Sequence, residues 1–426
     1  MYKIINKDSD ITPFGGLIFI ENALNQTQVG DLITKSLGTR NARAKYTYFD
    51  VMKSLFYNAI CQGEYVSDLE LLRARMLKKI QPFIPSHDTV EYASQELKTE
   101  NLVIEINEKS KHQINENSKF NELLPKLVKK LGLLKNKSEL TLDFDHVINE
   151  NEKFDSVKTY KHTNGYNPCF ANIGDLTVYY ENRNGNTPAK FRQKEAFENC
   201  FKNLNNNEIK INKVRADSAS YQKEVIDLVE SEGVNFYIRN VTSAKFRDIC
   251  TAVENWEKVS YNNETLEVAS VKYRPFDGKT EYRVVVQRRL FNEKDELFEE
   301  LKYAYYGIIT NDLEMNDLGV IQFYNQRGHV SENYNKNLLN DFNIKHLPFM
   351  DLDTNTVFMG FMAACGILFE WLKSIMVKNK VQGVEIQHRV KRFFFKYVSV
   401  CAKIVRHAGR ETLQIFGKDT YNYLII

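Results

Sequence analysis

The segment Leu140-Thr141-Leu142-Asp143-Phe144-Asp145 alternates strictly between apolar and polar residues. A period of two is typical of a half-buried β-strand, so its three apolar residues are predicted to face one side. Asp143 and Asp145 project from the other side, because successive side chains of a strand point to opposite faces. The strand therefore brings two carboxylates to the same face of a sheet.

The segments after this strand predict a mixed sheet with helices on its faces. In chain order the patterns indicate two strands, a helix, a strand, a helix and a short strand, at Asn167–Ile173, Leu176–Arg183, Lys190–Leu204, Ile209–Ala216, Tyr221–Ser231 and Phe236–Ile238. This is the order of the ribonuclease-H-like fold, in which the first and fourth strands are neighbours. Asp217 follows the fourth strand, so its carboxylate and that of Asp145 are expected to meet.

The chain divides into five predicted regions. Residues 1–137 are expected to be a helical DNA-binding domain with lysines on the helix Phe120–Leu134, or else a plain helical bundle with solvated lysines. Residues 138–240 form the first part of the α/β core, residues 241–310 a β-rich insertion, and residues 311–350 the second part of the core. Residues 351–426 are predicted to be a basic, helical C-terminal region.

The whole chain is nearly neutral, with 58 Lys and Arg against 55 Asp and Glu and a formal charge of +3. Its 43% hydrophobic and 27% charged residues exclude a disordered chain. From Trp371 to Ile426, however, 11 Lys and Arg stand against 3 Asp and Glu, a local charge of +8. This concentration fits either a solvated surface or contacts with a phosphate backbone, for which the candidates are Arg389, Lys391 and Arg392.

The composition also bears on where the chain works. Its six cysteines form no C-x-x-C pair, which argues against a zinc site and fits free thiols in a reducing cytosol. The first ten residues, MYKIINKDSD, lack the apolar segment of a signal peptide. The apolar run Val357–Phe369 is too short to span a bilayer and is predicted to be a buried helix. A cytoplasmic protein without membrane contact is therefore expected.

Acidic residues are the best candidates for chemistry. The chain contains no G-x-S-x-G, Walker A or H-E-x-x-H motif, and its eight histidines are scattered. Asp143, Asp145, Asp217 and Glu332 offer hard oxygen ligands, which suit Mg²⁺ or Mn²⁺. Two such ions can activate a water or a 3′-hydroxyl and stabilise the leaving oxygen of a phosphoryl transfer. Taken alone, any one of these acids is better explained as a surface or capping residue.

Six blocks of sequence add to this pattern. They are Ser86–Val90, Leu142–Asp145, Asn182–Thr187, Arg215–Ser218, Tyr324–Gly328 with Glu332-Asn333, and Asn340–Phe342. Their order and spacing resemble the DDE transposases of bacterial insertion sequences, and the fifth block resembles the Tyr-Arg-Glu signature of one branch. The resemblance runs from about Gly15 to the C-terminus. It implies a ribonuclease-H-like catalytic core, an N-terminal DNA-binding domain and a β-rich insertion, for which the 115 positions from Asp217 to Glu332 leave room.

The resemblance also implies an activity, a cofactor and partners. Members of this family bind the terminal inverted repeats of a mobile element, cleave the DNA and transfer its strands. The cofactor implied is Mg²⁺ or Mn²⁺, with two ions in the site. The partners implied are double-stranded DNA and a second copy of the chain, as a homodimer on paired ends in the bacterial cytoplasm, associated with the nucleoid.

Individual roles follow from the same resemblance. The catalytic metal ligands would be Asp145, Asp217 and Glu332. Asp143 is a candidate additional acid in the first block. Tyr324 and Arg327 would contact the DNA backbone near the cleaved phosphate, which a guanidinium can bind with two hydrogen bonds. Trp256, in the insertion, would either stack on an unpaired base or, as is more usual for Trp, belong to the core.

The third acid departs from the family pattern in its spacing. Four residues separate Arg327 from Glu332, where the signature has three, and one residue turns a helix by about 100°. The assignment of Glu332 therefore depends on where its helix starts. Asp351 and Asp353 are rival acids, but both lie near a predicted helix N-terminus, where capping is the better interpretation.

Two other functions stay open at this point. A ribonuclease-H-like nuclease would use the same acids without strand transfer. A DNA-binding protein derived from a transposase would have lost catalysis, and the intact acids argue against it. Capture of specific terminal repeats without cleavage in Mg²⁺ would favour this last alternative.

Overall fold

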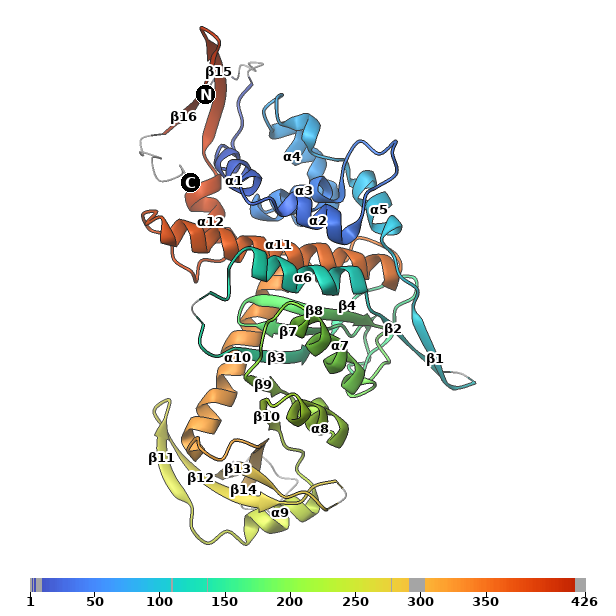
Figure 1. Cartoon of the computed structure of the whole chain (residues 1–426), viewed down its shortest axis with the longest axis vertical. Coiled ribbons are helices and arrows are strands. Elements are labelled where there is room, and N and C mark those ends of the chain that lie inside the picture. The colour runs from blue at the N-terminus through green and yellow to red at the C-terminus, as the bar shows by residue number, and fades with distance from the viewer. Residues whose placement is uncertain are drawn as a thin grey trace.

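The computed structural model describes residues 2, 4, 10–108, 110–135, 137–276, 278–290 and 303–417. Within these ranges, the side chains of Pro82 and of residues 328–337 are not described. The molecule is elongated (Figure 1), with a cluster of helices at one end, a sheet covered by helices in the middle and a group of long strands at the other end.

One sheet extends through most of the molecule. Among the described residues it has eleven strands, in the order β1-β2-β8-β7-β3-β9-β10-β14-β13-β12-β11. Its central strands are β3 (Thr141–His146), β7 (Cys169–Ile173), β8 (Leu176–Arg183), β9 (Lys213–Ala216) and β10 (Asn235–Arg239). β7 is antiparallel to β3 and β8, whereas β3, β9 and β10 are mutually parallel. This arrangement confirms the predicted ribonuclease-H-like order, with the first and fourth strands as neighbours.

The two faces of this central sheet are covered by different helices. On one face Phe144 of β3 stacks on Phe197 of α7 (Gln193–Asn205), with ring centroids 4.2 Å apart. The helix α8 (Lys223–Ser231) connects β9 to β10. The opposite face, which carries Asp143 and Asp145, meets α10 (Asp317–Asn340) and α11 (Leu352–Lys378). The strand alternation read from the sequence therefore separates an apolar face from a charged one.

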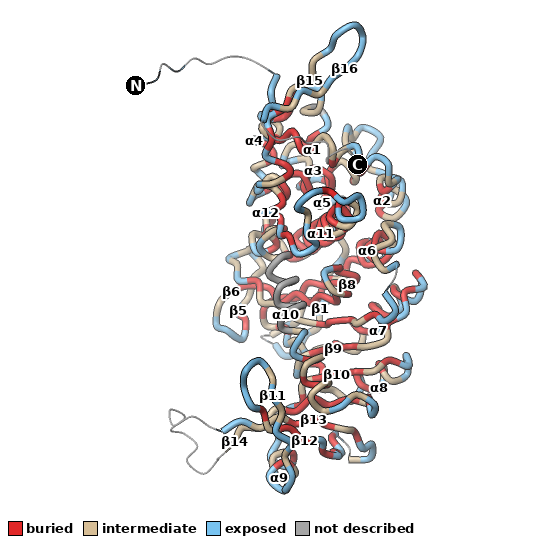
Figure 2. Tube along the Cα trace, turned by 90° about the vertical axis from the view of Figure 1, so that its left-hand side faces the viewer, coloured by how far each residue is buried: buried red, intermediate tan, exposed pale blue. Residues whose placement is uncertain are grey.

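The helix α11 is the central element of the fold. It is 27 residues long and packs against α3, α6 and β8. It crosses the molecule in Figure 1, and Figure 2 shows that it is largely buried. By length and composition it could cross a membrane, but 78% of its most apolar window is buried inside the protein. The prediction that the run Val357–Phe369 is a buried helix is confirmed.

The strands expected in the insertion continue the main sheet. They are β11 (Glu257–Tyr261), β12 (Glu264–Tyr273), β13 (Tyr282–Leu290) and β14 (Tyr303–Thr310). β14 pairs antiparallel with β10, so these strands extend the edge of the core. The helix α9 (Ala244–Thr251) precedes them. The insertion therefore shares one continuous sheet with the core.

The N-terminal region is mostly helical, with one exception. Its helices are α1 (Gly16–Asn25), α2 (Val29–Leu37), α3 (Tyr48–Ile60), α4 (Leu69–Arg75), α5 (His87–Glu96) and α6 (Ser118–Lys130), with short 3₁₀ turns at Val66–Asp68 and Gln81–Phe83. A hairpin of β1 (Leu102–Asn107) and β2 (Ser110–Asn115) interrupts them and joins the edge of the main sheet at β8. The prediction that residues 1–137 are mainly helical did not include this hairpin, in which only Ile104–Asn107 of β1 alternates between apolar and polar residues.

The C-terminal region is also not helical throughout. After α12 (Val390–Phe393) and a π-helical turn (Phe394–Val398), the strands β15 (Cys401–His407) and β16 (Arg410–Phe416) form a separate hairpin. The expected helical region 351–426 is therefore wrong for these residues, in which only Thr412–Ile415 of β16 alternates between polar and apolar side chains. The remaining short elements are β4 (Asn149–Glu150), β5 (Val157–Lys158), β6 (Asn164–Tyr166) and a 3₁₀ turn at Ser218–Ser220.

We expect substitution of Gly360, in the middle of α11, to destabilise the fold. A Cβ atom there would lie 2.4 Å from Tyr180 Oη and 2.5 Å from Phe120 Cγ. Gly360→Ala should lower the free energy of unfolding by about 1–3 kcal/mol through overpacking, although alanine is the better helix former. Urea denaturation measures this change, with Ser374→Ala on the same helix as the control. An unchanged or higher stability of Gly360→Ala would contradict this close packing.

Candidate functional site

Two adjacent parallel strands end in carboxylates at the same edge. In the register of β3 and β9, Phe144 lies opposite Ala216, and the next residues along the two strands are Asp145 and Asp217. Asp217 caps the 3₁₀ turn Ser218–Ser220, where its Oδ1 accepts a hydrogen bond from Ala219 N at 3.0 Å. The predicted meeting of the first and fourth strands therefore brings these two acids side by side.

The environment of Asp145 keeps a proton on its carboxyl to a higher pH than usual. Burial is the largest cause of a pKa raised to about 6, and the negative charges of Asp217 and Asp143 raise it further. Arg327 opposes the shift, since its Nη2 lies 2.7 Å from Asp145 Oδ1. Oδ1 also accepts a hydrogen bond from His146 N at 3.0 Å. A cation placed between the two acids would relieve their repulsion.

Asp143 has a different environment, although it shares the face of Asp145. Its side chain is 1% exposed, and both of its oxygens accept hydrogen bonds from Arg215, with Nε–Oδ1 and Nη2–Oδ2 distances of 2.7 Å. Burial raises the pKa of Asp143, and the Arg215 guanidinium opposes that shift. The carboxylate is thus engaged in an ion pair between β3 and β9. This geometry gives Asp143 a structural role, and its assignment as an additional acid of the site stays a prediction.

Arg215 also holds the helix α10 against the sheet. Its Nη1 donates a hydrogen bond to the carbonyl oxygen of Phe323 at 2.7 Å, and the Phe323 ring lies over the guanidinium with 4.7 Å to its centroid. The same ring contacts Tyr237 of β10. Sequence reasoning missed Arg215, although its place two residues before Asp217 put it on the same face, in register with Asp143.

The helix α10 brings the Tyr-Arg block to the two acids. Tyr324 is 8% exposed in an apolar cluster with Tyr237, Ile308 and Val320. Burial raises its pKa, and Asp217 and Asp145 are close enough to raise it further. Arg327, one turn later, reaches Asp145 with a side chain that is 15% exposed. Tyr324 and Arg327 therefore lie together beside Asp145 and Asp217.

Glu332 lies in the same helix, but its side chain is outside the described residues. The helix begins at Asp317, so the unusual spacing falls inside a continuous helix. Five residues along a regular helix turn by about 500°, which leaves positions 327 and 332 about 140° apart around the axis. Within the described part of the chain, no group of three or more His, Cys, Asp or Glu side chains could hold a metal ion. Glu332 as the third ligand therefore stays a prediction.

The rival acids Asp351 and Asp353 lie elsewhere and have structural partners. Asp351 is the N-cap of α11, and its Oδ1 accepts a hydrogen bond from Thr354 N at 2.8 Å. Asp353 lies 3.3 Å from Lys98 Nζ. The capping interpretation is confirmed for Asp351.

Trp256 is part of the packing of the insertion. Its Nε1 donates a hydrogen bond to Val253 O at 3.0 Å, and the guanidinium of Arg288 lies 4.4 Å from the centre of its ring. Its ring also lies near that of Tyr305, with centroids 6.0 Å apart. These contacts favour the core interpretation of Trp256 over base stacking.

The three basic candidates of the C-terminal region differ in their surroundings. Arg389 forms two hydrogen bonds with Asp341, Nη2–Oδ1 at 2.7 Å and Nε–Oδ2 at 3.0 Å, so it joins the start of α12 to the segment after α10. Lys391 and Arg392 are exposed. Of the three, Lys391 and Arg392 are therefore the better placed for a DNA backbone.

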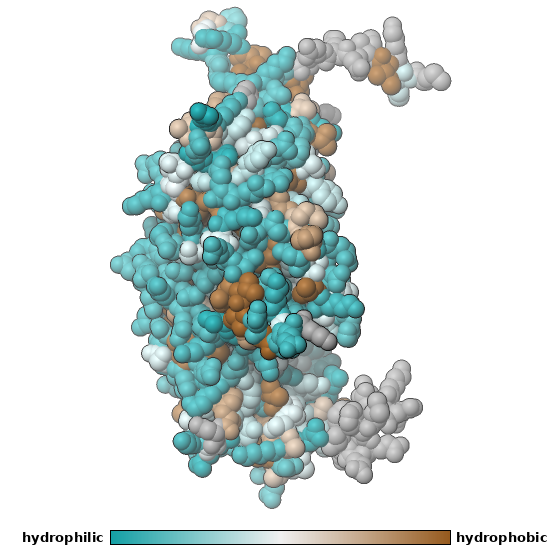
Figure 3. All heavy atoms as spheres, turned by 90° about the vertical axis from the view of Figure 1, so that its right-hand side faces the viewer, coloured by the Kyte–Doolittle hydropathy of each residue, from teal (hydrophilic) through white to brown (hydrophobic). Residues whose placement is uncertain are grey.

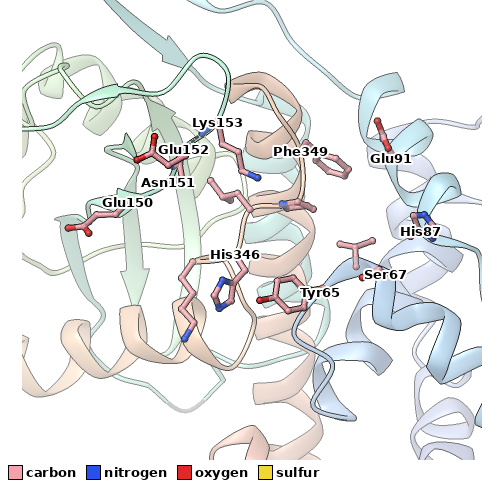
Figure 4. Close-up of a pocket in the computed structure, with 14 residues that line it drawn as sticks. Tyr65, Ser67, His87, Glu91, Glu150, Asn151, Glu152, Lys153, His346 and Phe349 are labelled. Carbon is pink, nitrogen blue, oxygen red and sulfur yellow. Dashed lines mark hydrogen bonds between the residues drawn. The ribbon is translucent and has the colours of Figure 1, made fainter. Parts of the chain in front are cut away.

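A large open cavity lies away from these acids. It has a volume of about 570 Å³ and lies between the N-terminal helices and the segments around β4 and after α10 (Figure 4). Its lining includes His87, Glu91, Glu152, Lys153 and His346, from three separate parts of the chain. Charges of both signs line this cavity, and neither Asp145 nor Asp217 does.

A family model described as transposase DDE domain group 1 matches residues 4–425 of the chain. The chain belongs to the DDE transposases. Proteins of this family transfer phosphoryl groups on DNA and generally use divalent metal ions. Asp145 and Asp217, with oxygen ligands on adjacent strands, are the acids that the described site offers for such ions.

Two structures of solved transposases match parts of the chain at low TM-scores. A piggyBac transposase synaptic complex with hairpin DNA has 12% sequence identity and a TM-score of 0.40, over 90% of this chain and 78% of that one. The Mos1 transposase paired-end complex has 14% identity and a TM-score of 0.18, over 40% of this chain and 56% of that one. No curated protein matches the chain. At these TM-scores nothing about individual site residues follows from either structure.

We expect Asp143→Asn to destabilise this DDE transposase strongly. The substitution removes one partner of a buried ion pair and leaves the Arg215 charge uncompensated, which costs about 3–5 kcal/mol. The free energy of unfolding from denaturant titration measures the loss. The control Glu139→Gln breaks an exposed ion pair with Lys213, which lies on β9 like Arg215. It should change the free energy of unfolding by less than about 1 kcal/mol. Equal effects of the two substitutions would show that the Asp143–Arg215 pair contributes no more to stability than an exposed ion pair.

Proposed function

We propose that the chain cuts and joins DNA at the ends of a bacterial insertion sequence. The observation that carries the proposal is the meeting of Asp145 and Asp217 at the ends of adjacent parallel strands, with Arg327 of the Tyr-Arg block beside them. Two carboxylates on one edge suit a divalent cation, and an Arg fork suits a phosphate. A metal site next to a phosphate-binding group is what phosphoryl transfer on DNA requires.

The proposal assigns a separate role to each residue of the site. Asp145 and Asp217, with Glu332 as the third ligand, would hold two Mg²⁺ or Mn²⁺ ions. Bound there, the ions would activate first a water and later a freed 3′-hydroxyl, and would stabilise the leaving oxygen. Arg327 balances the charge of Asp145 and is placed to bind the phosphate next to the cleaved bond. Tyr324, packed one turn earlier on α10, positions Arg327.

The wider setting is part of the same proposal. The chain belongs to the Tyr-Arg-Glu branch, binds the terminal inverted repeats as double-stranded DNA, and works as a homodimer that holds both element ends. It acts on chromosomal DNA in the bacterial cytoplasm. The cut-and-paste reaction then needs one active site for cleavage and strand transfer at each end.

A second candidate function has one observation in its favour. Because α10 is continuous from Asp317, the extra residue between Arg327 and Glu332 lies inside the helix and rotates position 332 around the helix axis. A transposase-derived protein that binds element ends without cutting would result if no third acid reaches Asp145 and Asp217. A nuclease without strand transfer has no comparable support.

We expect substitutions of the acids to abolish cleavage without preventing DNA binding. Asp145→Asn, Asp217→Asn and Glu332→Gln each keep the side-chain shape but remove a negative charge needed for a divalent ion. The assay measures cleavage of duplexes that contain the genomic sequences flanking the gene, in Mg²⁺ and in Mn²⁺, together with binding in EDTA. Asp227→Asn, in an exposed ion pair on α8, is the control.

The outcomes of this assay separate the alternatives. Loss of cleavage in all three variants, with binding retained, is the expected result. Normal cleavage by Glu332→Gln would remove that residue from the site. Specific binding by the parent chain without any cleavage would favour the non-cutting alternative.

We also expect DNA affinity to fall steeply with salt. Each neutralised phosphate releases counterions, so log K should fall with log salt by about 0.9 per contact. Replacing exposed Lys391 and Arg392 with alanine should flatten this slope over ~50–200 mM salt. The control replaces Lys194 and Lys223, on α7 and α8, which pair with acids on the helices of the opposite sheet face. A slope near zero for the parent chain would contradict binding to the DNA backbone.

A further inference from the structure

The hairpin β15–β16 projects from the end of the molecule that carries the N-terminal helices (Figures 1 and 2). Its strands pair in antiparallel register over seven residue pairs, from Cys401 opposite Phe416 to His407 opposite Arg410. The turn consists of Ala408 and Gly409, both with positive φ, of 49° and 78°. A two-residue turn of this kind matches the twist of the strands and leaves a narrow tip with small side chains.

The two faces of this hairpin differ in chemistry. Residues that lie directly opposite each other share a face, and successive pairs alternate between faces. One face carries the apolar residues Ala402, Ile404, Leu413 and Ile415 and, nearer the turn, the pair Arg406 and Glu411. The other face carries five polar residues, Lys403, His407, Arg410, Thr412 and Gln414, together with Cys401, Val405 and Phe416. Of these five polar residues, all except the partly buried Lys403 are exposed.

The base of the hairpin is attached to the body. Ala402 and Thr12 exchange two backbone hydrogen bonds of 2.9 Å, and Gly15 N donates to Val400 O at 2.7 Å. Lys79, after α4, forms an ion pair with Glu411. These contacts fix the base of the hairpin to the N-terminal segment, so that the polar face has a defined direction. A defined direction is a requirement for reading a ligand through several side chains at once.

The exposed polar face has the groups that recognise base pairs. In the major groove Arg pairs with guanine O6 and N7, Gln pairs with adenine N6 and N7, and Thr can contact several bases. The groove admits a two-stranded β-ribbon. Lys403 and Arg410 give this face a positive charge, whereas Arg406 and Glu411 lie opposite each other on the other face. Exposed Lys391 and Arg392 precede the base of the hairpin in the chain. Base-reading and phosphate-binding groups therefore lie close together in the chain.

The other protruding hairpin, β1–β2, differs from β15–β16 in the side chains that it exposes. The hairpin β1–β2 exposes Leu102, Val103 and Ile106, each at least 45% exposed. It lies on the side of the molecule from which Figure 3 is viewed, where a small apolar patch stands out on a mostly hydrophilic surface. Its β1 strand has a carboxylate, Glu105, opposite Lys111 of β2. The two hairpins are therefore suited to different partners.

We infer that β15–β16 enters the major groove of double-stranded DNA with its polar face and reads the sequence of the element ends. This inference rests on the proposed function. It assigns Arg410 and Gln414 to base edges, and Lys391 and Arg392 to the phosphates beside them. Because base contacts carry the sequence information, the hairpin determines which DNA ends the protein selects.

The test compares two duplexes of equal length and composition, one with the inverted repeat that flanks the gene and one with that repeat scrambled. The full-length chain and its variants are titrated with both in EDTA. Arg410→Ala and Gln414→Ala should each weaken binding to the repeat by about 5–150-fold, the value of one bidentate base contact, and binding to the scrambled duplex far less. Arg410→Lys keeps the charge but not the fork, so it should lose the preference while the salt dependence is unchanged.

Two controls complete the experiment. Lys111→Ala, on β2 of the other hairpin, should leave both affinities unchanged. Melting temperatures equal to that of the parent chain should show that the variants are folded, as expected for exposed positions.

Each other outcome counts against the inference. Equal weakening on both duplexes would show that the hairpin contacts only phosphates. A parent chain that prefers the repeat, with variants that keep this preference, would overturn the hairpin as the reading element but leave the proposed function intact. A parent chain with no preference for the repeat would overturn both.

Discussion

The ion pair between Asp143 and Arg215 fixes the geometry on which the site depends. It is buried, it joins β3 to β9, and Arg215 extends it to the backbone of α10 at Phe323. Neither charge is tolerable alone in this position, because an unpaired buried ion costs several kcal/mol. The helix α10 follows β9 only after the whole insertion, so its return to this sheet face needs specific contacts. Arg215 provides them, and Arg327 is thereby placed against Asp145.

The charges on this face of the sheet have separate roles. Asp143 and Arg215 neutralise each other within the buried part of the strands. Asp145 and Asp217 lie at the strand ends, where Arg327 opposes the negative charge of the two acids. Burial is the main cause of the raised pKa of Asp145, and the nearby charge of Asp217 raises it further. A site for cations therefore arises at the point where the strand pairing ends. At the far end of the molecule, a different surface, the hairpin β15–β16, is suited to holding and reading the duplex.

Much of the core could be predicted from the sequence, because strand alternation is a strong signal. The alternation of residues 140–145 and the order of the following segments were sufficient to place Asp145 next to Asp217. The role of Asp143 could not be predicted in the same way, since alternation gives its face but not the residue opposite it. The hairpins β1–β2 and β15–β16 were missed because their strands are short and alternate only in part, so that their pattern differs little from that of an amphipathic helix. The assignment of the third acid depends on which way a residue points from a helix, and one extra residue rotates its side chain by about 100° around the helix axis.

The most direct test of this account is a crystal structure of the chain grown with Mn²⁺, with anomalous diffraction to locate the metal. The account predicts a peak bound by the carboxylates of Asp145 and Asp217, at about the 2.1 Å typical of such oxygen ligands, with Arg327 displaced from Asp145 and the Asp143–Arg215 pair intact. The same map would show whether Glu332 is the third ligand. An absent peak, or a metal bound by Asp143 in place of Arg215, would contradict the account.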